Sequence, residues 1–201
     1  MPEETVEPVD GRLARSHRTR RGIVDALRSL HAEGDLRPTA PRVAERAGVS
    51  LRTVWQHFDD LEELFVEAGR VDVEIASSYI TPVDGGLPLA QRVDAVVEQR
   101  VRMFEAMAPT WRAARLQEPF SPQIQSNRDR LMELGRAHVA SVFRDELAGA
   151  PAALLDAVHA ATSWALWESL RNDLGLDVAA SRRAVDRIVR GLLAAGDEEE
   201  R

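Results

Sequence analysis

The sequence contains no cysteine, no lysine and only one tyrosine. Without cysteine the chain has neither a disulfide framework nor a thiolate metal site. It also lacks an apolar run of about 18 residues, and residues 1–10 are acidic and carry prolines, so we expect neither a membrane span nor a signal peptide. These absences predict a cytoplasmic protein, away from any membrane, and we expect no cofactor and no metal.

Catalytic patterns are missing too. The chain has no Ser-His-Asp spacing, no Gly-rich phosphate loop and no H-E-x-x-H, and its five histidines are scattered. His138 and His159 are the two histidines that can meet across packed helices, but a histidine on a helix is more often packed or solvated than catalytic. We therefore expect no catalytic residue and no enzyme. Turnover would be the observation that supports an enzyme on this frame.

The charge is unevenly distributed along the chain. The net charge is -7, yet residues 11–57 hold ten arginines against four acids, whereas residues 58–201 hold sixteen arginines against 25 acids. A basic block inside an acidic protein is typical of an electrostatic footprint for nucleic acid. The alternative is that these arginines decorate solvated helices. The arginines that precede residue 22 either lie along phosphates or belong to a solvated tail, and both readings stay open.

Residues 39–58 predict two short helices joined by a tight turn. Thr39 is expected to cap the first helix, and Pro41 falls in its first turn, where a missing N–H costs nothing. Gly48 can end that helix in a left-handed conformation, and Ser50 can cap the next one. Two capped helices with a fixed turn are what a helix-turn-helix requires.

A family resemblance follows from these residues. The segment 19–64 resembles the DNA-binding domain of the TetR family of bacterial transcriptional regulators, since residues 44–50 read A-E-R-A-G-V-S and residues 53–58 read T-V-W-Q-H-F. Two positions depart from the usual pattern: Trp55 replaces a tyrosine, and Leu61 stands where a lysine is common. The resemblance implies an all-α fold, with an N-terminal three-helix helix-turn-helix domain and a C-terminal helical domain for ligand binding and dimerisation.

The apolar periodicity predicts helices throughout and no sheet. We expect an arginine-containing flexible arm (1–17), a DNA-binding domain (18–60), an effector-binding and dimerisation domain (61–196) and an acidic tail (197–201). The expected helices cover about 18–33, 40–47, 51–57, 60–78, 87–107, 110–117, 122–147, 151–173 and 178–195.

The candidate DNA-binding residues surround the second helix of the motif. Arg52, Gln56 and Leu51 are expected to face base edges, because arginine pairs with guanine, glutamine with adenine, and an apolar group with the thymine methyl. The donors expected to hold phosphates are Thr39, Arg42, Ser50, Thr53, Trp55 and His57.

The second half of the chain supplies candidate ligand and dimer residues. Its aromatic and methionine side chains are suited to an apolar cavity between helices, although ordinary core packing explains each one singly. The expected ligand residues are Met103, Phe104, Met107, Trp111, Arg115, Phe120, Asn127, His138, Trp164, Trp167 and Glu168. The last two helices are apolar on more than one side, so a second copy of the chain is expected to cover Leu155, Val158, Leu166, Val185, Ile188, Val189 and Leu192.

The resemblance and the residues together predict a homodimeric repressor with two partners, operator DNA and a small-molecule effector of unknown identity. An effector-binding or protein-interaction module that has lost sequence-specific DNA binding is the alternative, and a monomeric helical bundle is the alternative to the dimer.

Overall fold

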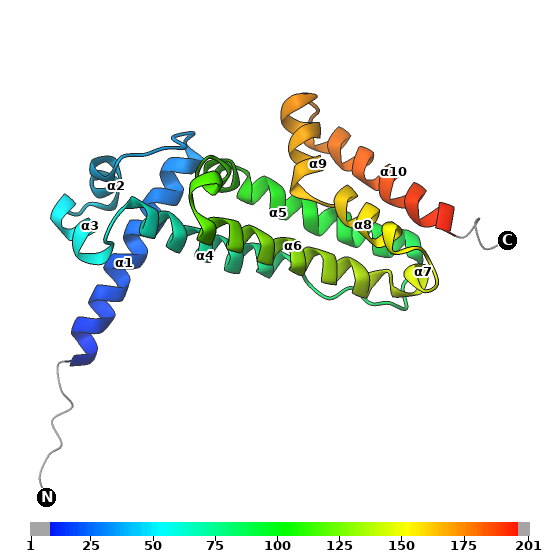
Figure 1. The fold of residues 1–201 in the computed structure, drawn as a ribbon, viewed down its shortest axis with the longest axis horizontal. Helices are drawn as coiled ribbons and strands as arrows, with labels where there is room; N and C mark the ends of the chain where they lie inside the picture. The colour runs from blue at the N-terminus through cyan, green and yellow to red at the C-terminus, as the bar shows by residue number, and fades with distance from the viewer. Residues whose placement is uncertain (1–8, 197–201) are drawn as a thin grey trace, which may run out of the picture. The chain divides into compact units, whose positions relative to one another are not determined.

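The structure, a computed structural model, describes residues 9–196, and every regular element in that range is helical (Figure 1). The expected all-α fold with an N-terminal helix-turn-helix is confirmed. In chain order the elements are α1 (Val9–Ala32), α2 (Ala40–Ala47), α3 (Leu51–His57), α4 (Leu61–Tyr79), α5 (Leu89–Gln117), η1 (Glu118–Phe120), α6 (Pro122–Val142), α7 (Arg144–Leu147), α8 (Ala152–Ala161), α9 (Trp164–Glu168), η2 (Ser169–Asp173) and α10 (Val178–Gly196).

Packing divides the described chain into two units. The first holds the residues up to Val71 together with Pro109–Gln125, and the second holds Asp72–Ala108 and the residues from Ser126 onward. The boundary expected after residue 60 falls inside the first unit, because Leu64 and Ala68 on the first turns of α4 pack into the core of the helix-turn-helix. Both α4 and α5 therefore contribute residues to each unit.

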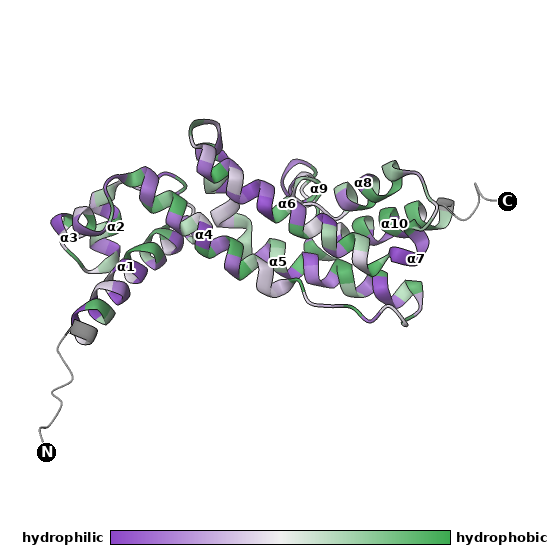
Figure 2. Cartoon of the chain, turned by 60° about the horizontal axis from the view of Figure 1, so that its bottom comes forward, coloured by the Kyte–Doolittle hydropathy of each residue, from purple (hydrophilic) through white to green (hydrophobic). Residues whose placement is uncertain are grey.

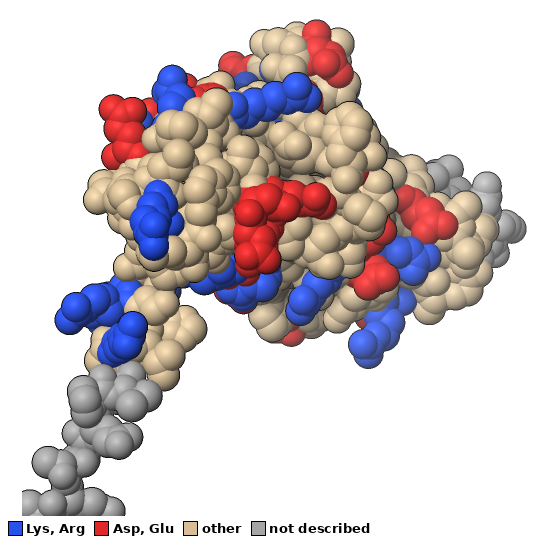
Figure 3. Space-filling view, turned by 60° about the vertical axis from the view of Figure 1, so that its left-hand side comes forward, with Lys and Arg blue, Asp and Glu red and all other residues tan. Residues whose placement is uncertain are grey.

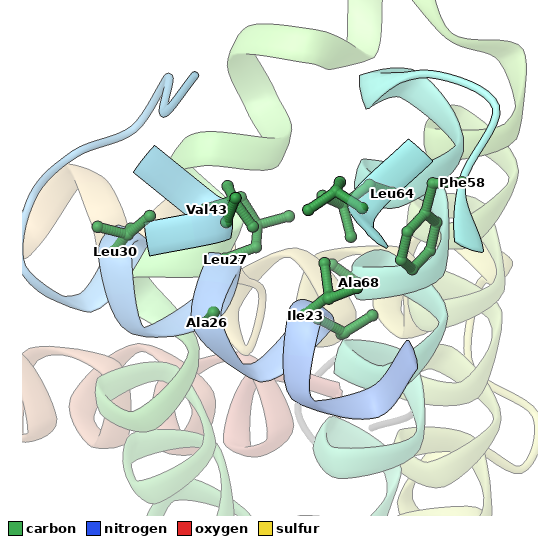
Figure 4. Close-up of a cluster of buried hydrophobic side chains, with 11 residues drawn as sticks. Ile23, Ala26, Leu27, Leu30, Val43, Phe58, Leu64 and Ala68 are labelled. Atoms are coloured by element: carbon green, nitrogen blue, oxygen red, sulfur yellow. The ribbon is translucent and has the colours of Figure 1, made fainter. Parts of the chain in front are cut away.

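An apolar cluster holds α1, α2, α3 and α4 together in the first unit (Figure 4). Val54 is the inward residue of α3, and Val49 before it packs against the same cluster, as expected of a hydrophobic staple. Six residues of this cluster are at most 1% exposed: Ile23, Leu27, Val43, Val54, Phe58 and Leu64. With Val54 fixed inward, the opposite side of α3 must face solvent.

Two expectations about the first unit are corrected. First, α1 begins at Val9, so residues 9–17 of the expected arm are helical, while residues 1–8 and the tail 197–201 lie outside the described residues. Leu13 is 56% exposed, so this end of α1 is not held by burial of its one large apolar side chain. Second, Thr39 occupies the N-cap position of α2, but its side chain makes no capping hydrogen bond.

The predicted break at Pro109 was wrong, because α5 runs through it without interruption. A proline inside a helix removes one backbone hydrogen bond, but packing can outweigh that loss. Met107 and Ala113 on either side of the proline are both buried.

The two long helices predicted at 122–147 and 151–173 are each divided in the structure. Phe143 separates α6 from α7 because its backbone leaves the helical region while its side chain is buried. After α8, the Thr162 hydroxyl donates to the carbonyl oxygens of Val158 (3.0 Å) and His159 (3.2 Å), and Ser163 then caps α9. The extended backbone of Ser163 (φ -90°, ψ 159°) interrupts the helix between α8 and α9.

The second unit has a core of its own in which α8 packs along α10. Val96, Val139 and Val189 are all fully buried in it. Hydrophobic and hydrophilic residues intersperse along its helices (Figure 2), as expected of helices that bury one side. Among the described residues, no helix is both long and apolar enough to cross a membrane.

Candidate nucleic-acid interface

The turn between α2 and α3 is closed by local hydrogen bonds. Gly48 adopts φ 65°, and its N–H donates to the carbonyl oxygen of Glu45 (3.1 Å). The Val49 N–H donates to the carbonyl oxygen of Ala44 (3.0 Å), so the carbonyls of Ala44 and Glu45 in the last turn of α2 are satisfied. Ser50 then caps α3, because its hydroxyl oxygen accepts the Thr53 N–H at 3.0 Å. These predicted features are confirmed, and they fix the direction in which α3 leaves the turn.

The outer side of α3 carries Leu51, Arg52, Trp55 and Gln56, all of them exposed. Their spacing of one, four and five residues places them on one face of the helix, opposite the buried Val54. Among the described residues, no hydrogen bond or ion pair engages the side chains of Arg52 and Gln56. The two side chains expected to read bases are therefore available to a ligand.

The hydroxyl groups of Ser50 and Thr53, at the start of α3, form a hydrogen bond with each other. Ser50 Oγ and Thr53 Oγ1 lie 2.8 Å apart, so one hydroxyl hydrogen is used between them. The other hydroxyl hydrogen remains to donate outward, since each hydroxyl carries a single donor. The pair thus offers one preoriented donor beside the helix N-terminus, where an anion is favoured.

The remaining expected phosphate donors lie around the same surface. Thr39 is exposed, and Arg42 is also exposed but forms an ion pair with Asp35 (Nε–Oδ2 3.1 Å). The His57 ring is half-buried at the end of α3. Trp55, the first departure from the family pattern, is 41% exposed on the outer face. Leu61, the second departure, packs against the core cluster and therefore has a structural role.

Sequence reasoning missed the structural role of Arg20, which was counted with the basic block. Its guanidinium donates to the backbone carbonyl of His57 and to Glu63 (Nη2–Oε1 2.9 Å), and it lies 4.2 Å from the centre of the Phe58 ring. Arg20 therefore ties α1 to the C-terminal end of α3 and to α4. Its position three residues before the buried Ile23 was the signal that it belongs to the inward side of α1.

Glu63 is the acidic partner at this junction. The Asp59 backbone N–H donates to its Oε2 (2.7 Å), and the Glu63 N–H donates to Asp60 Oδ1 (2.8 Å), which caps α4. The hydrogen bond from Asp59 and then the one from Arg20 lower the pKa of Glu63. The carboxylate therefore stays ionised where it holds Arg20.

Internal ion pairs reduce the free positive charge of the basic block. Arg46 donates to Ser29 Oγ (2.8 Å) and pairs with Glu33, whose pKa it lowers. Together with Arg20 and Arg42, it is engaged within the first unit. Exposed arginines remain over the first turns of α1 (Figure 3), and these are Arg12, Arg15 and Arg18. The surface available to phosphates is thus smaller than the ten arginines of this block imply.

The residues expected to bind a ligand fall into both units. Met103, Phe104, Met107, Asn127, His138, Trp164, Trp167 and Glu168 belong to the second unit, whereas Trp111, Arg115 and Phe120 belong to the first. Arg115 is exposed and pairs with Glu118 (3.4 Å). Phe120 is 77% exposed and lines a cavity of about 430 Å³ in the first unit, together with Phe65 and Leu61. The eleven residues therefore do not line one site within either unit.

Within the second unit the aromatic side chains meet as a group. The Phe104 ring lies 5.8 Å from the Trp164 ring and 6.1 Å from the Trp167 ring, measured between ring centres. Trp167 is 1% exposed and donates its ring N–H to Glu105 Oε1 (2.9 Å). Glu105 also pairs with Arg171, so α5, α9 and η2 are fastened together around the aromatic group.

The expected dimer residues divide by burial. Val158, Val185 and Val189 are buried inside the chain, where they contribute to the core of the second unit. Leu155, Leu166 and Leu192 are half-buried, and Ile188 is 39% exposed. Only this second group can be covered further by another molecule.

Part of the first unit matches a known protein family. Residues 23–68 match the model of the family described as bacterial regulatory proteins, tetR family. No curated protein sequence matches the chain. Among solved structures, a transcriptional regulator from Rhodococcus sp. Rha1 superposes with a TM-score of 0.67 at 18% identity, covering 90% of this chain and 96% of that one.

Two further structures share the fold. A TetR-like transcriptional regulator from Rhodococcus sp. RHA1 has a TM-score of 0.59 at 18% identity and covers 87% of this chain and 95% of its own. A protein from Saccharomonospora viridis, solved in complex with choline, has a TM-score of 0.66 at 18% identity, with coverages of 87% and 96%.

The capped α2–α3 pair and the all-helical frame define the fold of a helix-turn-helix transcriptional regulator. The family match, which runs from α1 to α4, identifies the family of this helix-turn-helix. The N-terminal domain belongs to the TetR family of bacterial regulatory proteins.

Proposed function

We propose that the protein is a homodimeric repressor that binds a pseudo-palindromic operator and leaves it when a small-molecule effector binds. The observation that carries the proposal is the outer face of α3, where Arg52 and Gln56 project unpaired from a helix fixed at both ends. A recognition helix needs this combination of rigid backbone and free polar side chains.

Base reading is assigned to Arg52, Gln56 and Leu51. Arg52 fits the two acceptors of guanine, Gln56 fits adenine, and Leu51 fits the thymine methyl. The phosphate contacts are assigned to the hydroxyl pair of Ser50 and Thr53, with Thr39, Arg42, Trp55 and His57 around it. Arg42 would exchange its ion pair with Asp35 for a phosphate.

Dimerisation is supported by the apolar side chains that α8, α9 and α10 leave partly uncovered. Leu155, Leu166, Ile188 and Leu192 are the proposed contact residues, and the buried valines support them from beneath. A two-fold dimer would place two α3 helices in successive major grooves, about 34–36 Å apart.

The effector is assigned to the helical second unit. Its aromatic group offers apolar surface between helices, and a structural neighbour was solved with the small molecule choline. Because α4 contributes to both units, a ligand that moves its second half would change the spacing of the two α3 helices. A coupling of about 2.7 kcal/mol would weaken operator binding roughly 100-fold.

The test is a titration of the purified protein against the DNA that flanks its own gene, at two salt concentrations. Arg52→Ala should cost about 1–3 kcal/mol of operator binding and relax specificity at one base position. Arg130→Ala is the matched control, because Arg130 is exposed on α6 and far along the chain from α3. An equal loss on all DNA sequences would make Arg52 a phosphate contact. Binding that ignores DNA sequence would favour the interaction module instead.

A further inference from the structure

Arg100 on α5 is a buried cation without a carboxylate. It is 4% exposed, its Nη2 donates to the carbonyl oxygen of Gly135 (3.2 Å), and its Nε is buried without a hydrogen-bond partner. Among the described residues no acidic side chain forms an ion pair with it. Buried charges in proteins are normally paired, because losing water is otherwise too costly.

Arg92, two turns earlier on α5, shows how this chain treats a buried arginine that is structural. It is 6% exposed, and its guanidinium donates to Glu146 Oε2 (2.8 Å) and to the carbonyl oxygens of Val142 (2.8 Å) and Leu87 (3.0 Å). All three nitrogens of that guanidinium donate to groups of the protein. Arg100 has one such bond, so it lacks the partners that a purely structural arginine has.

Two histidines complete a cluster around Arg100. His138 Nε2 lies 3.2 Å from the carbonyl oxygen of Thr81, and a carbonyl only accepts, so the ring hydrogen sits on Nε2. The Nδ1 atoms of His138 and His159 are both buried without a partner. Burial, followed by the charge of Arg100, lowers the pKa of each ring, with Arg136 adding to the effect at His159 and Asp156 opposing it.

Gly135 on α6 allows the cluster to close. A Cβ added there would lie 3.2 Å from His159 Cε1 and 3.5 Å from Arg100 Nη2. The backbone of α6 therefore runs directly against both groups, and only a glycine leaves them this near. Arg100 from α5 and His159 from α8 thus meet at the same point of α6 in the second unit, and His138 lies one turn farther along that helix.

The chemistry of these groups fits a carboxyl group. The cluster offers one uncompensated positive charge, one free guanidinium donor and two imidazole nitrogens. A carboxylate balances the charge, accepts from Arg100 with one oxygen, and shares a single proton with an imidazole Nδ1 through the other.

The neighbours of Arg100 on the same face of α5 are apolar. Val96, Val97, Met103 and Phe104 stand three or four residues away and are all buried. Phe104 leads to the aromatic group with Trp164. A ligand anchored at Arg100 would therefore lie with its body against hydrocarbon.

We propose that Arg100, His138 and His159 bind the carboxylate of an apolar organic acid. The assignment rests on the proposed function, because it takes the second unit as the effector site. It is a binding role, in which Arg100 supplies the charge and the two imidazoles complete the hydrogen bonds.

The first test measures the melting temperature of the full chain without DNA. The probes are acetate, hexanoate and decanoate, each beside its neutral amide, with inorganic phosphate as the anion that lacks an apolar body. We expect hexanoate and decanoate to raise the melting temperature more than their amides do. Arg100→Met should weaken hexanoate binding about 10- to 100-fold, as loss of a charge-assisted hydrogen bond implies. Arg102→Met is the matched control on the exposed side of α5 and should leave binding unchanged.

Three results would contradict a carboxylate site at Arg100. Equal effects of every acid and its amide would overturn the proposal, and so would binding that survives Arg100→Met. Stabilisation by phosphate alone would leave an anion site but overturn the assignment to a carboxylate. Because no DNA is present, failure of operator release would not affect these results, and a failure here would leave operator binding standing.

A second measurement keeps the test valid if Arg100→Met does not fold. In the unmodified protein, NMR of the imidazole C–H groups should show hexanoate displacing the resonances of His138 and His159 and raising the pKa of both. The resonances of His17, exposed on α1, should stay in place. Movement of neither His138 nor His159 at saturating hexanoate would overturn the proposal.

Discussion

His31 makes the first unit sensitive to acid. It is 4% exposed at the end of α1, stacked on Phe65 with ring centres 6.0 Å apart, and neither ring nitrogen has a hydrogen-bond partner. Burial lowers its pKa to about 4, against the opposing charge of Asp35 and with a further contribution from Arg28. The folded protein therefore holds this imidazole neutral.

The direction of the pH effect follows from that depressed pKa. As the pH falls below about 6.5, the unfolded chain takes up a proton at His31 before the folded chain does, so folding stability decreases. The loss is absent well above that pH and complete below about 4. At about 1.4 kcal/mol per pKa unit, moving from about pH 7.5 to about pH 5 should cost about 2 kcal/mol.

The perturbation that tests this is His31→Leu, which removes the titrating group and its unpartnered nitrogens while keeping an apolar side chain in place. Denaturant unfolding followed by circular dichroism gives the stability of both proteins at each pH. The advantage of the variant over the unmodified chain should widen by about 2 kcal/mol between about pH 7.5 and about pH 5. His17→Leu, at an exposed position on α1, is the control and should not change the pH slope. Parallel pH profiles of His31→Leu and the unmodified chain would refute the reasoning.

Two further substitutions test the ion pairs that hold each unit. Arg20→Met should destabilise the first unit by about 1–3 kcal/mol in denaturant unfolding, because the His57 carbonyl and Glu63 lose a charged donor; an unchanged stability would show that the bridge contributes nothing. Arg92→Met should cost about 3–5 kcal/mol in the second unit, because the largely buried Glu146 loses its partner, and the double variant Arg92→Met, Glu146→Leu should recover most of that loss. If the double variant is no more stable than Arg92→Met, the uncompensated carboxylate is not the cause.

The helix-turn-helix was predictable because its determinants are local. Gly48 and Ser50 act within a few positions of themselves, so their spacing predicted the end of α2 and the start of α3. The same reasoning failed at Pro109, where burial of neighbouring side chains sustains a helix that the local rule would end.

Other features depend on contacts that spacing does not encode. The division of α8 from α9 occurs at Thr162 and Ser163. Serine and threonine also stand inside helices elsewhere in this chain, so their presence alone does not predict a break. Arg20 and Arg100 look like any other arginine in the sequence, and only the approach of α4 to one and of α6 to the other reveals their surroundings. The residues expected to bind a ligand lie in both units for the same reason. Composition does not show that the C-terminal end of α5 packs into the first unit.

Arginine is the only basic residue type besides histidine in this chain, so every cationic task falls to it. Its partner therefore distinguishes one role from another. Arg20 meets a carboxylate and a backbone carbonyl and stabilises the fold, whereas Arg52 meets neither and remains available to DNA. Arg100 combines burial, as in the first role, with the missing carboxylate of the second. A cation enclosed by the fold but not neutralised by it is where an external anion contributes most, because the protein has already lost the water that would otherwise compete.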